Sequence, residues 1–267
     1  MSQRASRRSR TSKPAGKLAC IQMLPLLGLP EFRAGDDLAR AIFEDARKSR
    51  IAFENGDVLV IAQKIVSKVE GRIVDLSTIP ASQAAHDLAA KLKKDARLVE
   101  VILRESRRIV RSAPVLIVET HHGFVCANAG VDQSNVPGRD AVSLLPRDPD
   151  ASARKLAASL RKLTRKRVAV IVSDTFGRPW RLGLTNVAIG AAGVPVLLDL
   201  RGTRDFHNKP LHATILAIAD ELAAAAGLVM AKSAGVPAVI IHGYRYRASA
   251  RERAANIIRP AGEDLFR

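Results

Sequence analysis

Short blocks of mostly apolar residues alternate with polar stretches along the chain, and seven of these blocks have the composition of strands. They are rich in Val, Ile and Leu, they span five to seven residues, and turn-forming or charged residues bound them. We expect strands at 18–24, 57–62, 115–119, 124–129, 168–173, 194–200 and 236–242.

Five other segments repeat apolar residues every three or four positions, as amphipathic helices do. They predict helices at 36–49, 82–94, 96–110, 150–164 and 214–230. Asp36, Ser82 and Asp150 stand where N-caps are expected. In the 96–110 segment, the arginines lie largely off the apolar stripe, which indicates a solvated face.

Strands and helices are mixed without strict alternation, so the pattern favours a mixed α/β or α+β fold with a mixed sheet. The chain has 267 residues, enough for one large domain or two small ones. We assign residues 1–17 to a tail and 18–267 to a folded region with room for two subdomains. The loop at 130–140 is a candidate for a domain seam or a functional loop.

Charge changes this picture at the N-terminus. The net charge is +17, and residues 1–17 hold six basic and no acidic residues, so the rest of the chain carries +11. The tail has almost no apolar residues, so we expect it to be disordered, and it has no hydrophobic core of a secretory signal. A solvated extension explains it most simply, although it could touch nucleic acid or an anionic surface.

Two further classes are disfavoured by composition. No charge-free apolar run reaches the ~18 residues of a membrane span, so we expect no membrane partner. Cys20 and Cys126 are the two cysteines, and two thiols make no disulfide framework in a chain of this length. We expect both to be small core residues in a reducing cytoplasm.

Polar clusters follow several predicted strands, which is where ligands collect in open α/β sheets. Asp132 and Asp174 each follow a strand, and Thr175 adds a hydroxyl. Such hard oxygen ligands suit Mg²⁺ or Mn²⁺, whereas separate Asx-turn capping by each aspartate is the plainer alternative. Lys64 and Lys68 would share a helix face that clamps a phosphate, or form an exposed basic pair.

Familiar nucleotide and hydrolase motifs are absent from the sequence. There is no GxxxxGK[ST], no GxGxxG, no HExxH and no GxSxG, so a P-loop, a Rossmann fingerprint, a zinc peptidase site and a nucleophile elbow are excluded. His121 and His122 stand at the turn of a predicted hairpin. Trp180, the one tryptophan, could stack on a planar ligand or pack in the core or an interface.

Taken together, the clusters resemble the coenzyme F420-0:L-glutamate ligase family, also called F420 γ-glutamyl ligase. The blocks ANAGVDQSN (127–135) and SDTFGRPWR (173–181) carry most of the resemblance. Further matching blocks run through nearly the whole chain after the tail: GLPEFRAGDDL (28–38), NGDVLVIAQKIVSKVEGRIVDL (55–76), RLVEVILRES (97–106), LLPRDPDASA (144–153), VAIGAAG (187–193) and ADELAAAAGLVM (219–230).

The resemblance implies a fold and a reaction. The fold is a two-part mixed α/β structure that forms an intertwined homodimer. The reaction uses GTP to join L-glutamate to the lactyl carboxylate of F420-0 through an acyl phosphate, releasing GDP and phosphate, and further glutamates are added in γ-linkage in some members. The implied cofactors are two Mg²⁺ or Mn²⁺ ions, with K⁺ as a further candidate.

Site residues follow from the same resemblance, position by position. Asp132 and Asp174 would hold metal, with Thr175 on a second ion, and Arg178 and Arg181 would face the anionic substrates beside them. The implied nucleotide-binding residues are Leu29, Pro30, Glu31, Phe32, Gln63, Lys64, Lys68, Asn135, Met230, Ala231, Lys232, Ser233, Ala234 and Gly235. Gly177 would let the chain turn after the metal ligands.

The sequence departs from the family pattern at three places. RLGLT (181–185) replaces the usual REGQT, DFHNK (205–209) replaces a D-x-FG-R block, and Ala231 and Lys232 change the loop after LVM. These departures bear on the acceptor or on the second metal site. A ligase for a variant F420 precursor and a member that binds without ligation therefore stay open. A basic nucleic-acid-binding protein is the alternative from another class, disfavoured by an aromatic content of only 4%.

Overall fold

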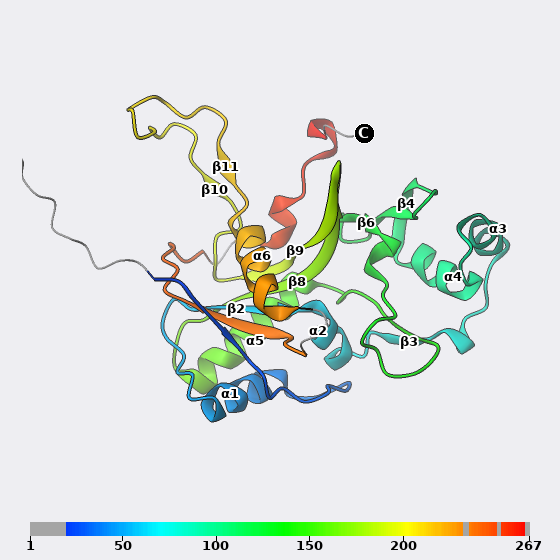
Figure 1. Cartoon of the computed structure of the whole chain (residues 1–267), viewed down its shortest axis with the longest axis horizontal. Coiled ribbons are helices and arrows are strands. Elements are labelled where there is room, and N and C mark those ends of the chain that lie inside the picture. The colour runs from blue at the N-terminus through cyan, green and yellow to red at the C-terminus, as the bar shows by residue number, and fades with distance from the viewer. Residues whose placement is uncertain (1–19, 232–234, 250–251, 265–267) are drawn as a thin grey trace, which may run out of the picture.

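The computed structural model describes residues 20–231, 235–249 and 252–264, and its centre is a five-stranded sheet (Figure 1). The strand order is β1-β12-β2-β8-β9. Only β2 and β8 pair in parallel, and the other neighbours are antiparallel, which confirms the predicted mixed sheet. The strands are β1 (Gln22–Pro25), β2 (Val58–Ala62), β8 (Ala169–Arg178), β9 (Arg181–Ala192) and β12 (Ala238–His242).

Helices cover both faces of this sheet because its strands are apolar on both sides. Leu59 and Ile61 of β2 pack with α1 (Leu38–Lys48) and α5 (Pro149–Thr164) on one face. Val58 and Val60 pack with α6 (Ile218–Met230) on the other, seen above the sheet in Figure 1. A fully buried strand with alternating residues in two cores gives a three-layer arrangement.

Two helices and several short strands lie to one side of the main sheet (Figure 1). Their buried side chains form a third apolar cluster. Ser82 caps α3 as predicted, since its side chain accepts from the Ala85 N–H group. The elements of this region are β3 (Ile73–Asp75), η1 (Leu76–Thr78), α3 (Gln83–Leu92), α4 (Ala96–Arg104), β4 (Ser106–Arg111), β5 (Ile117–Thr120), β6 (Val125–Ala127), η2 (Asn128–Gly130) and β7 (Ala141–Ser143). The hairpin turn predicted at 121–123 is confirmed between β5 and β6.

The prediction of one helix over residues 96–110 was wrong for the second half of that segment. α4 ends at Arg104, and residues 106–111 pair with β5 as the edge strand β4. The Ser106 hydroxyl donates to the Ile102 carbonyl at the end of the helix. Arg107 and Arg108 then reach Glu119 across the strand pair, a contact that the helical periodicity of the sequence does not reveal.

Other boundaries also differ from the expectations. Only Leu198–Asp199 of segment 194–200 forms a strand (β10), because Val194 and Val196 are buried in a loop that packs with α6. β10 pairs with β11 (Ile215–Leu216), so α6 begins four residues later than predicted. The caps of α1 and α5 are Asp37 and Asp148 rather than Asp36 and Asp150.

The largest difference concerns the segment after Asp174. The chain does not turn at Gly177: β8 continues to Arg178, turns at Pro179 and Trp180, and returns as β9. The sequence did not predict β9, because Gly183, Gly190 and the small residues around them lack strand character.

The remaining elements are short. They are α2 (Gln63–Val69), η3 (Ala254–Ile257) and η4 (Ala261–Glu263). The predicted disordered tail at 1–17 lies outside the described residues. Within the described ranges, every helix is too short or too polar to cross a membrane. Cys126 is buried as expected, whereas Cys20 is exposed beside β1, so the core prediction was wrong for Cys20.

Candidate active site

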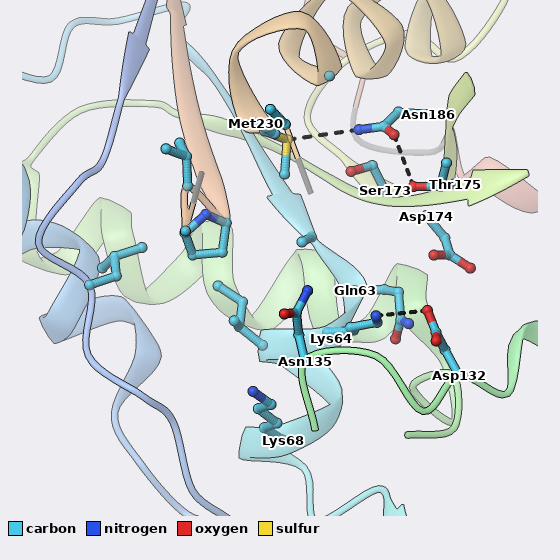
Figure 2. A pocket seen from close by; sticks show the side chains of 18 of the residues that line it. Gln63, Lys64, Lys68, Asp132, Asn135, Ser173, Asp174, Thr175, Asn186 and Met230 are labelled. Carbon is cyan, nitrogen blue, oxygen red and sulfur yellow. Dashed lines mark hydrogen bonds and ion pairs between the residues drawn. The ribbon is translucent and has the colours of Figure 1, made fainter. Parts of the chain in front are cut away.

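A cavity of about 520 Å³ opens at the ends of the parallel strands β2 and β8, between α2, α6 and the loop that follows β6 (Figure 2). The parallel pairing runs from Val58 with Ala169 to Ala62 with Ser173, so both strands deliver the residues that follow them to one edge. This is the edge at which open α/β sheets bind ligands. The volume is in the range of small-molecule sites.

Helix α2 begins directly after β2 and places three polar side chains at the cavity. Gln63 and Lys68 are buried, and Lys64 is largely buried. The Ser67 hydroxyl donates to the Gln63 amide oxygen at 2.8 Å. The amide nitrogen of Gln63 is buried and, among the described residues, has no hydrogen-bond acceptor. A ligand oxygen in the cavity would satisfy this donor.

Asp132 receives several donors in the loop after η2. The Lys64 ammonium lies 2.7 Å from one carboxylate oxygen, and Ser134 donates its N–H at 2.8 Å and its hydroxyl at 3.0 Å. Burial alone would raise the pKa of Asp132, but the hydrogen bonds and charge of Lys64 and Ser134 hold that pKa below its ordinary value. The carboxylate is therefore ionised at neutral pH.

Asp174 and Thr175 are neighbours on β8, so their side chains point to opposite faces of the strand. Figure 2 shows Asp174 pointing toward Asp132 and Thr175 pointing toward α6. The Thr175 hydroxyl donates to the Asn186 side-chain oxygen at 3.1 Å. Two carboxylates that face one another across a cavity fit a cation such as Mg²⁺, which takes few protein ligands and keeps phosphate and water as the others. Within the described residues, no group of three or more His, Cys, Asp or Glu side chains is gathered.

The loop after β1 closes another side of the cavity. Leu29, Pro30 and Glu31 line it, and the Glu31 carboxylate pairs with the Lys68 ammonium. Phe32 points instead into the core under α1, where it is buried. The loop is thus held by an apolar contact on its inner side and an ion pair on its cavity side.

Cys126 lies near the carboxylates but has the properties of a core residue. Burial raises the pKa of its thiol to about 12, and the negative charge of Asp174 adds to the effect. A thiol with that pKa is protonated at neutral pH and is a poor nucleophile. Cys126 is therefore not an activated nucleophile, and the polar groups on the cavity lining are the candidates for its chemistry.

Most residues singled out from the sequence meet at this cavity, although they come from five separate segments. Those on its lining are Leu29, Pro30, Glu31, Gln63, Lys64, Lys68, Asp132, Asn135, Asp174, Thr175, Met230, Ala231 and Gly235. Arg178 and Arg181 lie farther out, at the tip of the β8–β9 hairpin. Lys232, Ser233 and Ala234 fall outside the described residues.

Sequence reasoning missed Asn186 and Ser173, which also line the cavity. Asn186 lies opposite Thr175 in the hairpin, its amide nitrogen contacts the Met230 sulfur at 3.9 Å, and its side chain lies against Gly227 of α6. A Cβ on Gly227 would come within 3.0 Å of that side chain. The register of β9 is the signal that would have identified Asn186, and it requires the hairpin to be known.

The sequence of the chain matches a family model and several relatives along most of its length. The profile of the F420-0:Gamma-glutamyl ligase family matches residues 27–243. The coenzyme F420:L-glutamate ligase of Methanopyrus kandleri is 48% identical over 257 residues, which cover 94% of this chain and 100% of the relative. The protein of the same name from Methanothermobacter thermautotrophicus is 46% identical over 250 residues, 92% of this chain and 99% of the relative. The chain therefore belongs to the F420-0:gamma-glutamyl ligase family.

Proposed function

We propose that this protein ligates L-glutamate to coenzyme F420-0 and uses GTP to activate the acceptor carboxylate. The proposal depends above all on the pair Asp132 and Asp174, which face one another beside Lys64. The cavity that they line lies entirely within the residues that match the family model. Relatives named coenzyme F420:L-glutamate ligase match over at least nine-tenths of the chain. Family membership favours this reaction over nucleic-acid binding as the role of the positive charge.

The proposed reaction has two steps. The lactyl carboxylate of F420-0 attacks the γ-phosphorus of GTP, the bond to the β-γ bridging oxygen breaks, and GDP leaves with that electron pair. The amine of L-glutamate, after losing a proton to solvent, attacks the acyl carbon, and phosphate leaves as the amide forms. Neither step needs a covalent bond to the protein, which fits the raised pKa of Cys126, the cysteine near Asp174.

The residues of the site would act mainly by position and charge. Asp132 and Asp174 would hold Mg²⁺ or Mn²⁺, and the residues present fit that role because both carboxylates point into the cavity. The bound cations would neutralise phosphate charge and polarise the γ-phosphoryl group. Lys64 and Lys68 would meet phosphate oxygens, and the unsatisfied amide nitrogen of Gln63 would donate to another.

Lys64 has a second role in this proposal. Its ammonium pairs with the Asp132 carboxylate at 2.7 Å and donates to the Ser134 carbonyl at 2.8 Å. With Asp132 serving as a cation ligand, Lys64 would be free to turn to a phosphate oxygen of the nucleotide in the same cavity.

Four finer points belong to the same proposal. Thr175 and Asn186 would serve a second cation or a phosphate on the α6 side of β8. Further glutamates would be added in γ-linkage if the product can bind again as the acceptor. Binding of K⁺ as a further cofactor stays a prediction. A homodimer is supported by the projecting β10–β11 hairpin, whose Phe206 is 98% exposed (Figure 1).

The test is product mass. The protein is incubated with F420-0, L-glutamate, GTP and Mn²⁺, and the products are followed by mass spectrometry. A mass gain of one or more glutamyl units that requires GTP supports the ligase and gives the chain length. A second outcome is that F420-0 gains no mass while GDP release depends on a different carboxylate acceptor. That result would show that the acceptor is a variant precursor and not F420-0. No GTP binding at all would overturn the proposal.

A further inference from the structure

The turn between β6 and Asp132 holds three consecutive residues in the left-handed region. The φ angles are 53° at Asn128, 55° at Ala129 and 71° at Gly130. Glycine adopts this conformation freely and asparagine tolerates it, whereas alanine is disfavoured there because its Cβ crowds the following carbonyl oxygen. Alanine also has no polar side-chain atom that could stabilise the turn locally. Contacts with the rest of the fold must therefore hold this turn.

Apolar packing fixes the second half of the turn. Ala129 and the following Val131 are buried in the third apolar cluster. A Cβ on Gly130 would lie 2.8 Å from the Leu145 side chain, so the backbone passes close to that leucine. These contacts do not involve the side chain of Asn128, which is half-buried at the start of the turn.

Lys94 supplies a polar contact at the start of the turn. Its ammonium donates to the Asn128 side-chain oxygen at 2.7 Å, and the Asn128 N–H group donates to the Leu116 carbonyl at 2.8 Å. Burial lowers the pKa of Lys94, because the fold removes water from its charge. The Asn128 oxygen therefore replaces part of the hydration that this ammonium loses.

The backbone of Lys94 is itself fixed by the end of α3. Lys93 ends that helix in the left-handed conformation, and the Lys94 N–H group donates to the Ala89 carbonyl at 3.1 Å. The next residue, Asp95, caps α4. Lys94 thus stands between two helix ends, and its side chain reaches Asn128 from a rigid base.

The turn leads directly to Asp132, because Val131 alone separates Gly130 from it. On its other side, Asp132 exchanges backbone hydrogen bonds of 2.8 and 3.1 Å with Ser143 of β7. The main chain of Asp132 is therefore held by the turn before it and by the strand across from it. Its carboxylate points toward Asp174 across the cavity (Figure 2).

We propose that Lys94 is a positioning residue for the cation site. Through Asn128, it holds the turn in the conformation that presents the Asp132 carboxylate toward Asp174. Lys94 is not on the cavity lining, so it acts without touching substrate or cation. This inference rests on the proposed function, in which Asp132 holds a divalent cation. Loss of an outer contact that orients a metal ligand typically lowers metal affinity about 10- to 100-fold.

The experiment compares variants of this contact with a matched control on the same helix. Lys94→Met removes the donor but keeps a stem of similar length, and Lys94→Arg keeps a cationic donor. Asn128→Gly removes the acceptor while permitting the left-handed turn, and a variant with both Lys94→Met and Asn128→Gly completes a double-mutant cycle. Lys91→Met, at an exposed lysine in the last turn of α3, is the control.

Two quantities are measured on the metal-free protein. Calorimetric titration gives the Kd for Mn²⁺, and hydrogen exchange followed by mass spectrometry reports the opening of residues 126–134. Neither quantity depends on the ligase reaction. Thermal unfolding of each variant separates a local change at the turn from destabilisation of the whole fold.

We expect Lys94→Met to weaken Mn²⁺ binding at least about 10-fold and to speed exchange at 126–134, and Lys94→Arg to restore most of the affinity. Asn128→Gly should have a similar effect. The double variant should bind Mn²⁺ no more weakly than either single variant, because both substitutions remove the same contact. Lys91→Met should change neither quantity.

Unchanged Mn²⁺ affinity in Lys94→Met would overturn the positioning role. So would single effects that multiply in the double variant, or a loss of affinity that Lys94→Arg shares together with a lower Tm. If Mn²⁺ binding behaves as expected but F420-0 gains no glutamate, the positioning role stands and the proposed reaction fails. If the unaltered protein binds no Mn²⁺, the positioning role fails, whereas glutamate addition to F420-0 continues to test the reaction.

Discussion

At the scale of single residues, the cavity holds an ion-paired carboxylate and a buried amide donor that has no acceptor within the described part of the chain. Asp132 is already paired with Lys64, whereas the Gln63 amide nitrogen is buried without an acceptor among the described residues. Buried polar atoms left unsatisfied destabilise the folded chain. Their retention at a cavity is best explained by binding, so single substitutions there should change function more than stability.

Replacing Asp174 by asparagine should remove a cation ligand with little change of shape. We expect kcat/KM to fall by at least about 100-fold, because metal charge stabilisation is worth several kcal/mol. Mn²⁺ binding, measured by calorimetry, should weaken in parallel. Asp199→Asn, at an exposed aspartate paired with Arg201, is the control and should behave as the unaltered protein. Unchanged Mn²⁺ binding in the Asp174 variant would show that the cation site lies elsewhere.

Gln63→Glu should oppose phosphate binding specifically. The new carboxylate keeps an acceptor for the Ser67 hydroxyl but removes the free donor and adds negative charge toward the cavity. We expect the KM for GTP to rise by about 10-fold or more, since one lost charge-assisted contact is worth roughly 1.5–3 kcal/mol. Gln83→Glu, on exposed α3, is the control. A KM change for F420-0 instead of GTP would reverse the assignment of this end of the cavity.

At the scale of elements, the hairpin β8–β9 determines where Asp174, Thr175 and Asn186 point, and this hairpin was not predicted from the sequence. Strands β2, β8 and β12 could be predicted because their Val and Ile runs are buried on both faces. β9 could not, since glycines and alanines replace such a run where α5 packs closely. The carboxylates were therefore predictable one by one, whereas their orientation, and the part played by Asn186, depend on the register of a strand that tertiary packing specifies.

Gly190 allows helix α5 to approach β9 closely, so Gly190→Ala should destabilise the fold. A Cβ at Gly190 would lie 2.3 Å from the Pro149 carbonyl oxygen, and backbone atoms cannot move aside as a side chain can. We expect a loss of about 3 kcal/mol in the free energy of unfolding and a fall in Tm of roughly 5–10 °C. Gly262→Ala, where a Cβ meets nothing within 4 Å, is the control. Equal Tm values for the two variants would contradict the close packing.

Glu100 links α3 to α4 through a pH-dependent contact. Its carboxylate accepts the hydroxyl and N–H of Ser82 and pairs with Arg104, and these hydrogen bonds lower the pKa of Glu100 to about 2. A lowered folded-state pKa adds stability above the unfolded pKa of about 4.3, and this stability is lost as pH falls toward 2. Glu100→Gln should therefore lower Tm at pH 7 but less and less as the pH falls from 5 to 3.

The measurement is thermal unfolding of both proteins at several pH values, with Glu44→Gln as the control. Glu44 is more exposed and contacts Arg47 at 3.4 Å, so its replacement should change Tm little at any pH. A Tm difference for Glu100→Gln that stays constant from pH 7 to pH 3 would mean that packing, and not the charge of Glu100, links the two helices.

At the scale of the whole molecule, the β10–β11 hairpin is the part that the monomer explains least. Leu216 of β11 packs against the apolar cluster under α6, but the rest of the hairpin projects away from the sheet (Figure 1). Its tip carries Phe206, which is 98% exposed, between Asp205 and His207. An apolar ring at the end of a projecting hairpin is costly in solution and is typical of a segment that another subunit covers.

Phe206→Asp should therefore shift the protein from dimer to monomer. The aspartate would bury a charge without a partner in the proposed subunit contact, while the monomer loses no packing because the side chain is exposed there. Light scattering after size-exclusion chromatography should give twice 28.8 kDa for the unaltered protein and about 28.8 kDa for the variant, with equal Tm at high dilution. Leu228→Asp, an exposed leucine of α6, should leave the mass unchanged. A monomeric mass for the unaltered protein at micromolar concentration would contradict the proposed dimer. The exposed hairpin would then be a candidate contact for another protein.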